Sequence, residues 1–107
     1  MAVTPEGKIK RLVKAVLDAD DVWYFMPVQG GFGAAGLDYH AIIQCRGIAL
    51  AFFIETKAPG KEPTDRQETL IAKLRALGSK VFVISTAMDV ALLRVWIEDI
   101  RNASNQR

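Results

Sequence analysis

One segment, residues 48–57 (IALAFFIETK), constrains the fold more than any other part of the chain. Its first seven residues are all apolar, so a strand formed here is apolar on both faces, because successive side chains of a strand point to opposite sides. Such strands lie in the centre of a sheet that is covered on both faces. The segment therefore predicts a central strand in an α/β domain.

The rest of the sequence predicts three helices and three further strands. Thr4-Pro5-Glu6 is typical of a helix N-terminus, and Thr64 with Gln67 fits a capping box before a helix that ends at Gly78. Helices are expected at about residues 5–18, 64–77 and 87–103, and strands at 22–28, 37–44 and 80–85. The order α-β-β-β-α-β-α contains a hairpin and a strand–helix–strand unit, which favours a mixed sheet flanked by helices.

Length and composition indicate one globular domain over residues 1–107, with a core at about 4–103 and a loose tail, ASNQR. The net charge of +2 permits a nucleic-acid partner without requiring one. One cysteine (Cys45) and one histidine (His40) are too few for a disulfide or a structural zinc site, and we expect a cytoplasmic protein. No signal peptide or membrane-spanning run is expected. Trp23 and Trp96 are interpreted as core residues.

The stretch GFGAAG, residues 31–36, matches the G-x-G-x-x-G dinucleotide fingerprint. The fingerprint must open a helix whose N-terminus meets the pyrophosphate, and the alternating residues 37–44 leave no room for one. We therefore expect a glycine-rich loop, either without a specific role or able to approach a phosphate closely, and no nucleotide cofactor.

The central strand ends in two charged residues on one face. Glu55 and Lys57 are two apart, so they point the same way at the carboxyl end of the strand. A tight turn at residues 45–47 would pair positions whose numbers sum to about 92, which puts Asp38 opposite position 54, beside Glu55. Two carboxylates there repel each other unless a cation lies between them. Mg²⁺ suits two carboxylates, a backbone carbonyl and waters.

Lys57 adds the chemistry of phosphodiester hydrolysis. An ammonium beside a metal site can hold an attacking water or the scissile phosphate, where catalysis is mostly positioning and charge neutralisation. The simpler interpretations are a strand-start or turn residue for Asp38, and a frayed strand end with a surface ion pair for Glu55 and Lys57. The combined set favours a functional site.

In their order along the chain, these residues resemble the motif of the PD-(D/E)XK nuclease superfamily, and of its VRR-NUC (virus-type replication-repair nuclease) branch in particular. That branch has a glutamate in an early helix, a glycine shortly before an aspartate, an E-x-K strand end, a short Gly/Pro loop and a glutamine that opens a helix. Over residues 4 to about 85, these places are filled by Glu6, Gly36, Asp38, Glu55, Lys57, Pro59, Gly60 and Gln67. Leu37 stands where Pro or Ser often precedes the aspartate.

The resemblance implies a restriction-endonuclease-like fold and a Mg²⁺- or Mn²⁺-dependent deoxyribonuclease, a phosphodiester hydrolase. Asp38, Glu55 and the Thr56 carbonyl would be metal ligands, and Lys57 would orient or activate water. Gln67 would support the site as well as cap its helix. Glu6 would reach the metal directly or through water, or only interact with the helix dipole.

The resemblance also implies a DNA partner and a biological setting. It suggests structure-selective cleavage of Holliday-junction-like or branched DNA in phage replication, repair or recombination, within the host cytoplasm, by a homodimer. The candidates for phosphate contacts are Lys61, Arg66, Arg46, Lys10 and Lys14. Two other functions remain open: a catalytically silent DNA-binding subunit of the same fold, and a nucleotide-binding α/β module.

Overall fold

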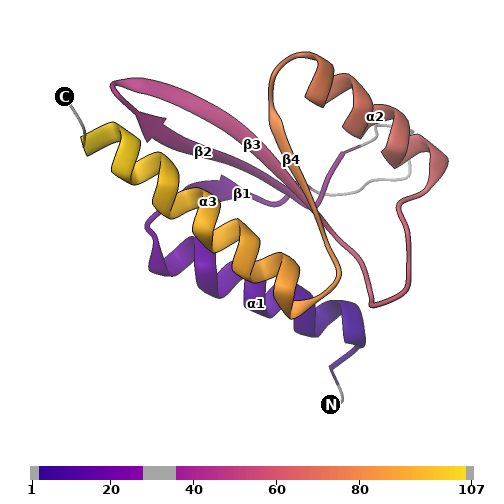
Figure 1. The fold of residues 1–107 in the computed structure, drawn as a ribbon. Helices are drawn as coiled ribbons and strands as arrows, with labels where there is room; N and C mark the ends of the chain where they lie inside the picture. The colour runs from indigo at the N-terminus through magenta and orange to yellow at the C-terminus, as the bar shows by residue number, and fades with distance from the viewer. Residues whose placement is uncertain (1–2, 28–35, 106–107) are drawn as a thin grey trace.

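A computed structural model describes residues 3–27 and 36–105 of the chain (Figure 1). Its elements follow the predicted order α-β-β-β-α-β-α. They are α1 (Pro5–Ala19), β1 (Trp23–Phe25), β2 (Tyr39–Cys45), β3 (Ile48–Thr56), α2 (Asp65–Ala76), β4 (Lys80–Ile84) and α3 (Ala87–Asn105).

The predicted caps begin the first two helices. The Thr4 hydroxyl accepts a hydrogen bond from the Gly7 N–H at 3.0 Å, and Pro5 occupies the first turn of α1. Thr64 and Gln67 form both bonds of a capping box at the start of α2. These side chains satisfy backbone donors that a helix start leaves without partners, so the caps fix where each helix begins.

The four strands lie in the order β1-β2-β3-β4. β1, β2 and β3 are antiparallel, whereas β3 and β4 are parallel and joined through α2. Arg46 and Gly47 form the two-residue turn between β2 and β3, with φ angles of 52° and 79°. Positive φ at both positions matches the right-handed twist of a hairpin. Arg46 is held in this conformation by hydrogen bonds from its N–H to Ser104 and from its Nε to the Ala103 carbonyl.

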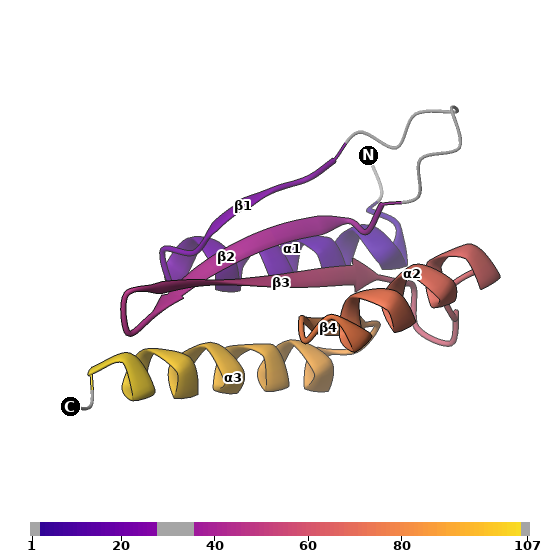
Figure 2. The ribbon, with the colours of Figure 1, turned by 90° about the horizontal axis from the view of Figure 1, so that it is seen from above.

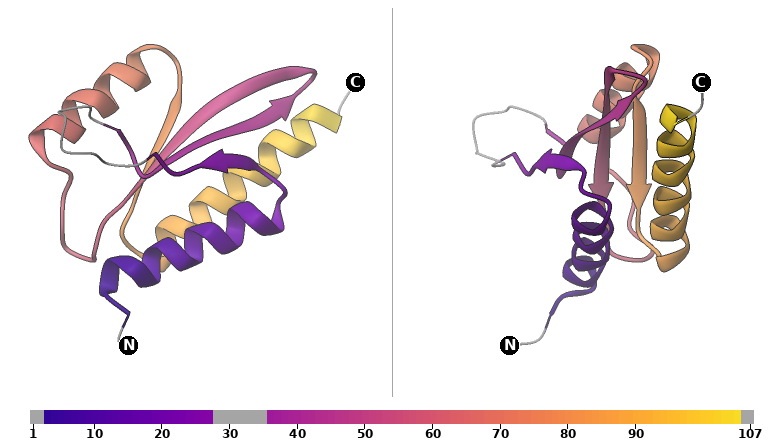
Figure 3. Two further views of the ribbon diagram at one scale, coloured as in Figure 1. Left: turned by 180° about the vertical axis from the view of Figure 1, so that it is seen from behind. Right: turned by 90° about the vertical axis from the view of Figure 1, so that its left-hand side faces the viewer.

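Helices cover the two faces of the sheet unequally. α1 and α3 lie side by side on one face, and α2 packs on the other face, mainly beside β4 (Figures 2 and 3). Phe52 and Ile54 of β3 are buried beneath α1 and α3, while Phe53 packs into a smaller cluster with α2. The prediction that the central strand is covered on both faces holds for its second half and is wrong for its first, where Ile48 is 64% exposed.

Several predicted boundaries differ from the structure. β1 contains only Trp23–Phe25 within the described residues. α3 continues through Asn105, so residues 103–105 are helical rather than part of a loose tail. The glycine-rich stretch lies outside the described residues except for Gly36, and the chain after it forms β2 rather than a helix. In the part of the chain that the structure describes, no helix is long and apolar enough to cross a membrane.

Candidate active site

Asp38 lies just before β2 and is fixed against the end of β3. Its Oδ2 atom accepts hydrogen bonds from the Thr56 N–H at 2.9 Å and from the Thr56 hydroxyl at 2.6 Å. Thr56 is fully buried, and Leu37, immediately before Asp38, is buried in the cluster beneath α2. The Asp38 side chain therefore has a defined position. The Thr56 hydroxyl is a site component that sequence reasoning missed, because its partner is visible only once the strand register is known.

Glu55 lies directly beside Asp38, because the register of β2 and β3 differs by one residue from the predicted one. Tyr39 pairs with Ile54, so paired positions sum to 93 and not 92, because Cys45 belongs to β2 and the turn has only two residues. This register places Asp38 next to Glu55, whose Oε1 accepts the Asp38 N–H at 3.1 Å. The Glu55 side chain is only 2% exposed. The predicted convergence of the two residues is thus present in the structure.

Lys57 follows β3 directly and points toward the same place. Its ammonium lies 3.3 Å from Glu55 Oε2, and its side chain is 16% exposed. Its backbone N–H donates to the Ile84 carbonyl of β4 at 2.9 Å, which continues the sheet past the end of the strand. The strand end is therefore neither frayed nor freely solvated, so the interpretation as a surface ion pair is wrong.

The environment of Glu55 raises its pKa to about 7. Burial is the main cause, because it disfavours the charged carboxylate, and the neighbouring Asp38 carboxylate acts in the same direction. The Lys57 ammonium and the hydrogen bond from the Asp38 N–H oppose the rise but are outweighed. In the absence of a cation, Glu55 therefore gives up its proton near neutral pH.

We predict that the metal-free protein loses stability as pH rises, because of Glu55. The folded pKa of Glu55 exceeds its ordinary value of 4.5, so between these values the folded state binds more protons than the unfolded state. The free energy of unfolding should fall across this window, on the order of 3 kcal/mol from this group. Urea unfolding in EDTA at pH 5 and pH 8 measures the slope. Glu55→Gln should lack this component, and an equal slope in both proteins would contradict the prediction.

Glu6 and Lys10 come from α1 and reach the site as a pair. Lys10 Nζ lies 3.8 Å from Glu6 Oε2 and 3.9 Å from Asp38 Oδ1. The buried Tyr39 ring anchors this turn of α1, since its hydroxyl donates to the Lys10 carbonyl at 3.3 Å. Glu6 thus approaches Asp38 through Lys10. Lys10, predicted as a DNA contact, lies among the carboxylates. The four-residue spacing of Glu6 and Lys10 in a predicted helix was the feature of the sequence that could have indicated this ion pair.

The donors present fit a hard divalent cation held by two carboxylates. Among the described residues, no group of three or more His, Cys, Asp or Glu side chains could hold a metal. The Thr56 N–H points to Asp38. Since the N–H and C=O of one strand residue point to the same edge of the strand, the Thr56 carbonyl is also directed to the Asp38 side of β3. Mg²⁺ is commonly bound through one or two carboxylates with waters in the remaining positions.

Gln67 is committed to its helix cap. Its Oε1 atom accepts the Thr64 N–H at 2.9 Å, and its own N–H donates to the Thr64 hydroxyl at 3.3 Å. The side-chain carbonyl is therefore used in the cap of α2, so a catalytic role of Gln67 would have to use its amide NH₂ group.

We predict that Gln67→Ala lowers the free energy of unfolding by about 1 kcal/mol, because it removes one half of the capping box. Gln67→Glu should stay close to the wild type, since a glutamate carboxylate can accept the same bond. Urea unfolding of both variants checks this, and equal stability of the two variants would argue against a capping contribution.

The remaining predicted DNA contacts lie in different places. Lys61 is exposed in the loop that follows Lys57, Arg66 is exposed in the first turn of α2, and Lys14 is exposed on α1. Arg46 lies at the hairpin, about 26 Å along β3 from the site at ~3.3 Å per residue. Its hydrogen bonds to Ala103 and Ser104 hold the hairpin against α3 at the far end of the sheet.

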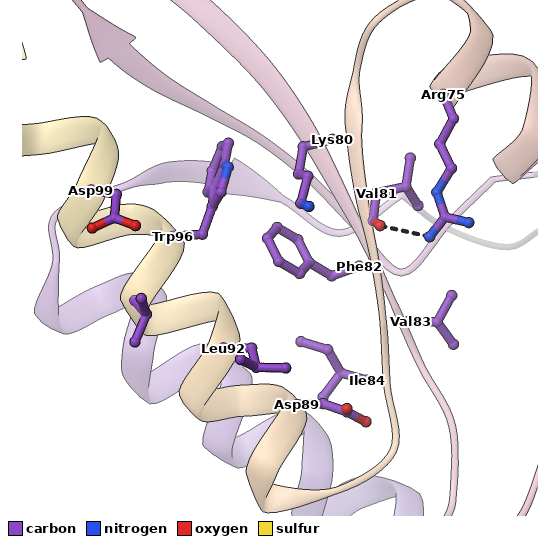
Figure 4. A pocket seen from close by; sticks show the side chains of 11 residues that line it. Arg75, Lys80, Val81, Phe82, Val83, Ile84, Asp89, Leu92, Trp96 and Asp99 are labelled. Carbon is purple, nitrogen blue, oxygen red and sulfur yellow. Dashed lines mark hydrogen bonds between the residues drawn. The ribbon is translucent and has the colours of Figure 1, made fainter. Parts of the chain in front are cut away.

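A hollow of about 420 Å³ lies between β4 and α3, separate from this site (Figure 4). Phe82 and Trp96 line it together in an edge-to-face contact, with 5.5 Å between their ring centroids, and Arg75 donates to the Val81 carbonyl. None of the carboxylates discussed above lines the hollow, so it belongs to a different surface of the molecule.

The similarity of this chain to known proteins concerns its fold. No protein-family model matches the sequence, and no curated protein matches it significantly. The structure is similar to a solved structure described as a VRR_NUC domain, with a TM-score of 0.68 and 25% sequence identity, over 84% of this chain and 94% of that one. The restriction-endonuclease-like fold predicted from the sequence is confirmed, and the similarity supports a nuclease-type function.

Proposed function

The structural similarity supports membership of the VRR-NUC family, and on that premise we propose that the chain is a metal-dependent DNA endonuclease. One observation carries the proposal: Asp38 and Glu55 converge at the end of β3, with the Lys57 ammonium 3.3 Å from Glu55. Two adjoining carboxylates with a neighbouring ammonium suit phosphodiester hydrolysis, where charge neutralisation and positioning supply most of the rate. The intact set argues against a catalytically silent DNA-binding subunit.

The ligands proposed for Mg²⁺ or Mn²⁺ are Asp38, Glu55 and the Thr56 carbonyl. Asp38 Oδ2 is occupied by two bonds from Thr56 and Glu55 Oε1 by the Asp38 N–H, which leaves Asp38 Oδ1 and Glu55 Oε2 for a cation. The cation would supply Lewis-acid polarisation of the scissile phosphate and lower the pKa of a coordinated water. Its charge favours ionised Glu55, which opposes the effect of burial on that carboxyl.

Lys57 is proposed to hold the attacking water or the scissile phosphate. The bond from its backbone to Ile84 fixes the base of its side chain, and Glu55 restrains the ammonium. Such preorganisation lowers the cost of reaching the transition state. Gln67 is proposed to keep the start of α2 near the site, with its amide NH₂ available for a further contact. Glu6 is proposed to act through Lys10 or through water.

DNA is the proposed partner, bound by basic residues beside the site. Lys61 and Arg66 follow Lys57 closely along the chain, and Lys14 lies one helical turn beyond Lys10 on α1. Phosphate contacts of this kind supply affinity without reading sequence. A C2 homodimer presents two sites at positions that match the two-fold symmetry of a Holliday junction, so we propose structure-selective cleavage of branched DNA in phage replication, repair or recombination. The host cytoplasm is the proposed location.

The test is cleavage of a four-way junction, a flap and a linear duplex, each with Mg²⁺ or with EDTA. The proposal expects cutting only with the metal and fastest cutting of the branched DNA. DNA binding without any cutting would favour the silent subunit instead. Equal rates on all three DNAs would remove the structure selectivity and leave the nuclease activity in place.

A further inference from the structure

A second lysine, Lys10, reaches the site from α1. Its ammonium is within 4 Å of two carboxylates from different elements, 3.8 Å from Glu6 Oε2 and 3.9 Å from Asp38 Oδ1. Its backbone is held by Tyr39, whose buried ring donates to the Lys10 carbonyl. The position of Lys10 over Asp38 is thus built into the packing of α1 on the sheet.

The carboxylate oxygens divide in a regular way between structural partners and ammonium groups. Asp38 directs Oδ2 to Thr56 and Oδ1 to Lys10, and Glu55 directs Oε1 to the Asp38 N–H and Oε2 to Lys57. The oxygens left for a divalent cation are therefore those that face the two lysines. Any cation that binds Asp38 Oδ1 meets the positive charge of Lys10.

The two lysines differ in how easily their ammonium groups can move away from the carboxylates. The Lys57 side chain is 16% exposed and follows a strand end that is bonded to β4. The Lys10 side chain is 35% exposed, and its contacts with carboxylates are long, at 3.8 and 3.9 Å. Lys10 can leave Asp38 for solvent or for a phosphate without breaking a buried contact.

We propose that Lys10 is a positioning residue that holds Asp38 and Glu6 in the metal-free protein and competes with the divalent cation for Asp38 Oδ1, and so sets the metal affinity of the site. This inference rests on the proposed function, since it needs a cation at Asp38. Its physical cause is the repulsion between a divalent ion and an ammonium that share one carboxylate at the protein surface. The competition weakens metal binding in the absence of DNA.

The test is a titration with Mn²⁺ alone, without DNA, at fixed ionic strength, in which bound Mn²⁺ is counted by the loss of the free-ion resonance signal. Lys10→Met keeps the length of the side chain and removes its charge, so the Kd for Mn²⁺ should fall about threefold to tenfold. Lys10→Arg keeps the charge and should retain the wild-type Kd. Lys8→Met removes an equal charge from an exposed position on α1 that has no ion pair among the described residues, and should also retain it.

The outcomes separate this inference from the proposed function. If the wild type binds Mn²⁺ and Lys10→Met binds it equally or more weakly, the inference is overturned and the nuclease proposal stands. Absence of Mn²⁺ binding in both the wild type and Lys10→Met overturns both. A Kd that falls equally in Lys10→Met and Lys8→Met reports only net charge and also overturns the inference. Circular dichroism verifies that each variant is folded. If Lys10→Met unfolds, Lys10→Gln, which also removes the charge, takes its place with the same expected fall in Kd.

Discussion

Replacing Lys57 with alanine is expected to slow DNA cleavage by about 10²- to 10⁴-fold while the protein still binds DNA. The ammonium lies 3.3 Å from Glu55 Oε2, at the carboxyl end of β3 where the scissile phosphate is proposed to bind. Its loss removes a positive charge that is positioned for the phosphate and that also favours the ionised form of Glu55. Single-turnover cleavage at saturating Mg²⁺ measures the rate, and binding in Ca²⁺ or EDTA measures affinity.

Lys80→Ala is the matched control for Lys57. Lys80 is an exposed lysine opposite Phe52 at the other end of the β3–β4 pair, and it lies over the Phe82 ring. Its removal should leave the cleavage rate unchanged. If both lysine variants lose activity to the same extent, the effect reports general electrostatics, and the specific role of Lys57 is contradicted.

The second large effect is expected at Asp38, where two substitutions separate metal binding from stability. Asp38→Asn keeps an oxygen that accepts the bonds from Thr56 but loses the charge. Mn²⁺ affinity should therefore fall by more than the roughly 10- to 100-fold that loss of an outer-shell partner costs. Cleavage should be lost with it, since the proposed cation is held by this carboxylate.

Asp38→Ala should in addition have a lower free energy of unfolding than Asp38→Asn. It leaves the buried N–H and hydroxyl of Thr56 without their acceptor, which we expect to cost on the order of 2–3 kcal/mol. Titration with Mn²⁺ and urea unfolding of the two variants check the two effects separately. An Asp38→Asn protein that binds Mn²⁺ like the wild type would exclude Asp38 as a ligand, and equal stability of the two variants would exclude its role in holding Thr56.

The parts of the fold that could be predicted are those that local chemistry dictates. The first two helices begin where the residue types indicate, at Thr4-Pro5 and at Thr64 with Gln67, because a cap depends only on residues within one turn. The shared face of Glu55 and Lys57 follows in the same way from the two-residue period of a strand. Both predictions needed no knowledge of distant contacts.

The errors arose where distant elements decide the outcome. The hydrophobic pattern of residues 48–57 does not say which helix covers each half of β3, and α2 packs mainly beside β4. Trp96 is packed against the core as interpreted, but Trp23 lies on the uncovered face of the sheet and is 58% exposed. The length of α2 and the edge position of β1 set these exposures, and neither is encoded near the residues affected.

The candidate site shows the same division. Asp38 was placed near Glu55 from an assumed turn, and the true register, shorter by one turn residue, brings the two closer. The bonds from Thr56 to Asp38 depend on the register of β2 and β3. The place of Lys10 between Glu6 and Asp38 depends on how α1 docks on the sheet. No local pattern gives that docking, which is why Lys10 was predicted only as a phosphate contact.

The central claim is that a divalent cation at Asp38 and Glu55 supports DNA hydrolysis. It is tested most directly by the cleavage rate of the wild-type protein as a function of Mg²⁺ concentration, with EDTA as the zero point and Asp38→Asn measured beside it. We expect a saturable rise from no cleavage in EDTA, and no rise for Asp38→Asn. Cleavage that persists in EDTA, or that rises with Mg²⁺ equally in both proteins, would contradict the claim.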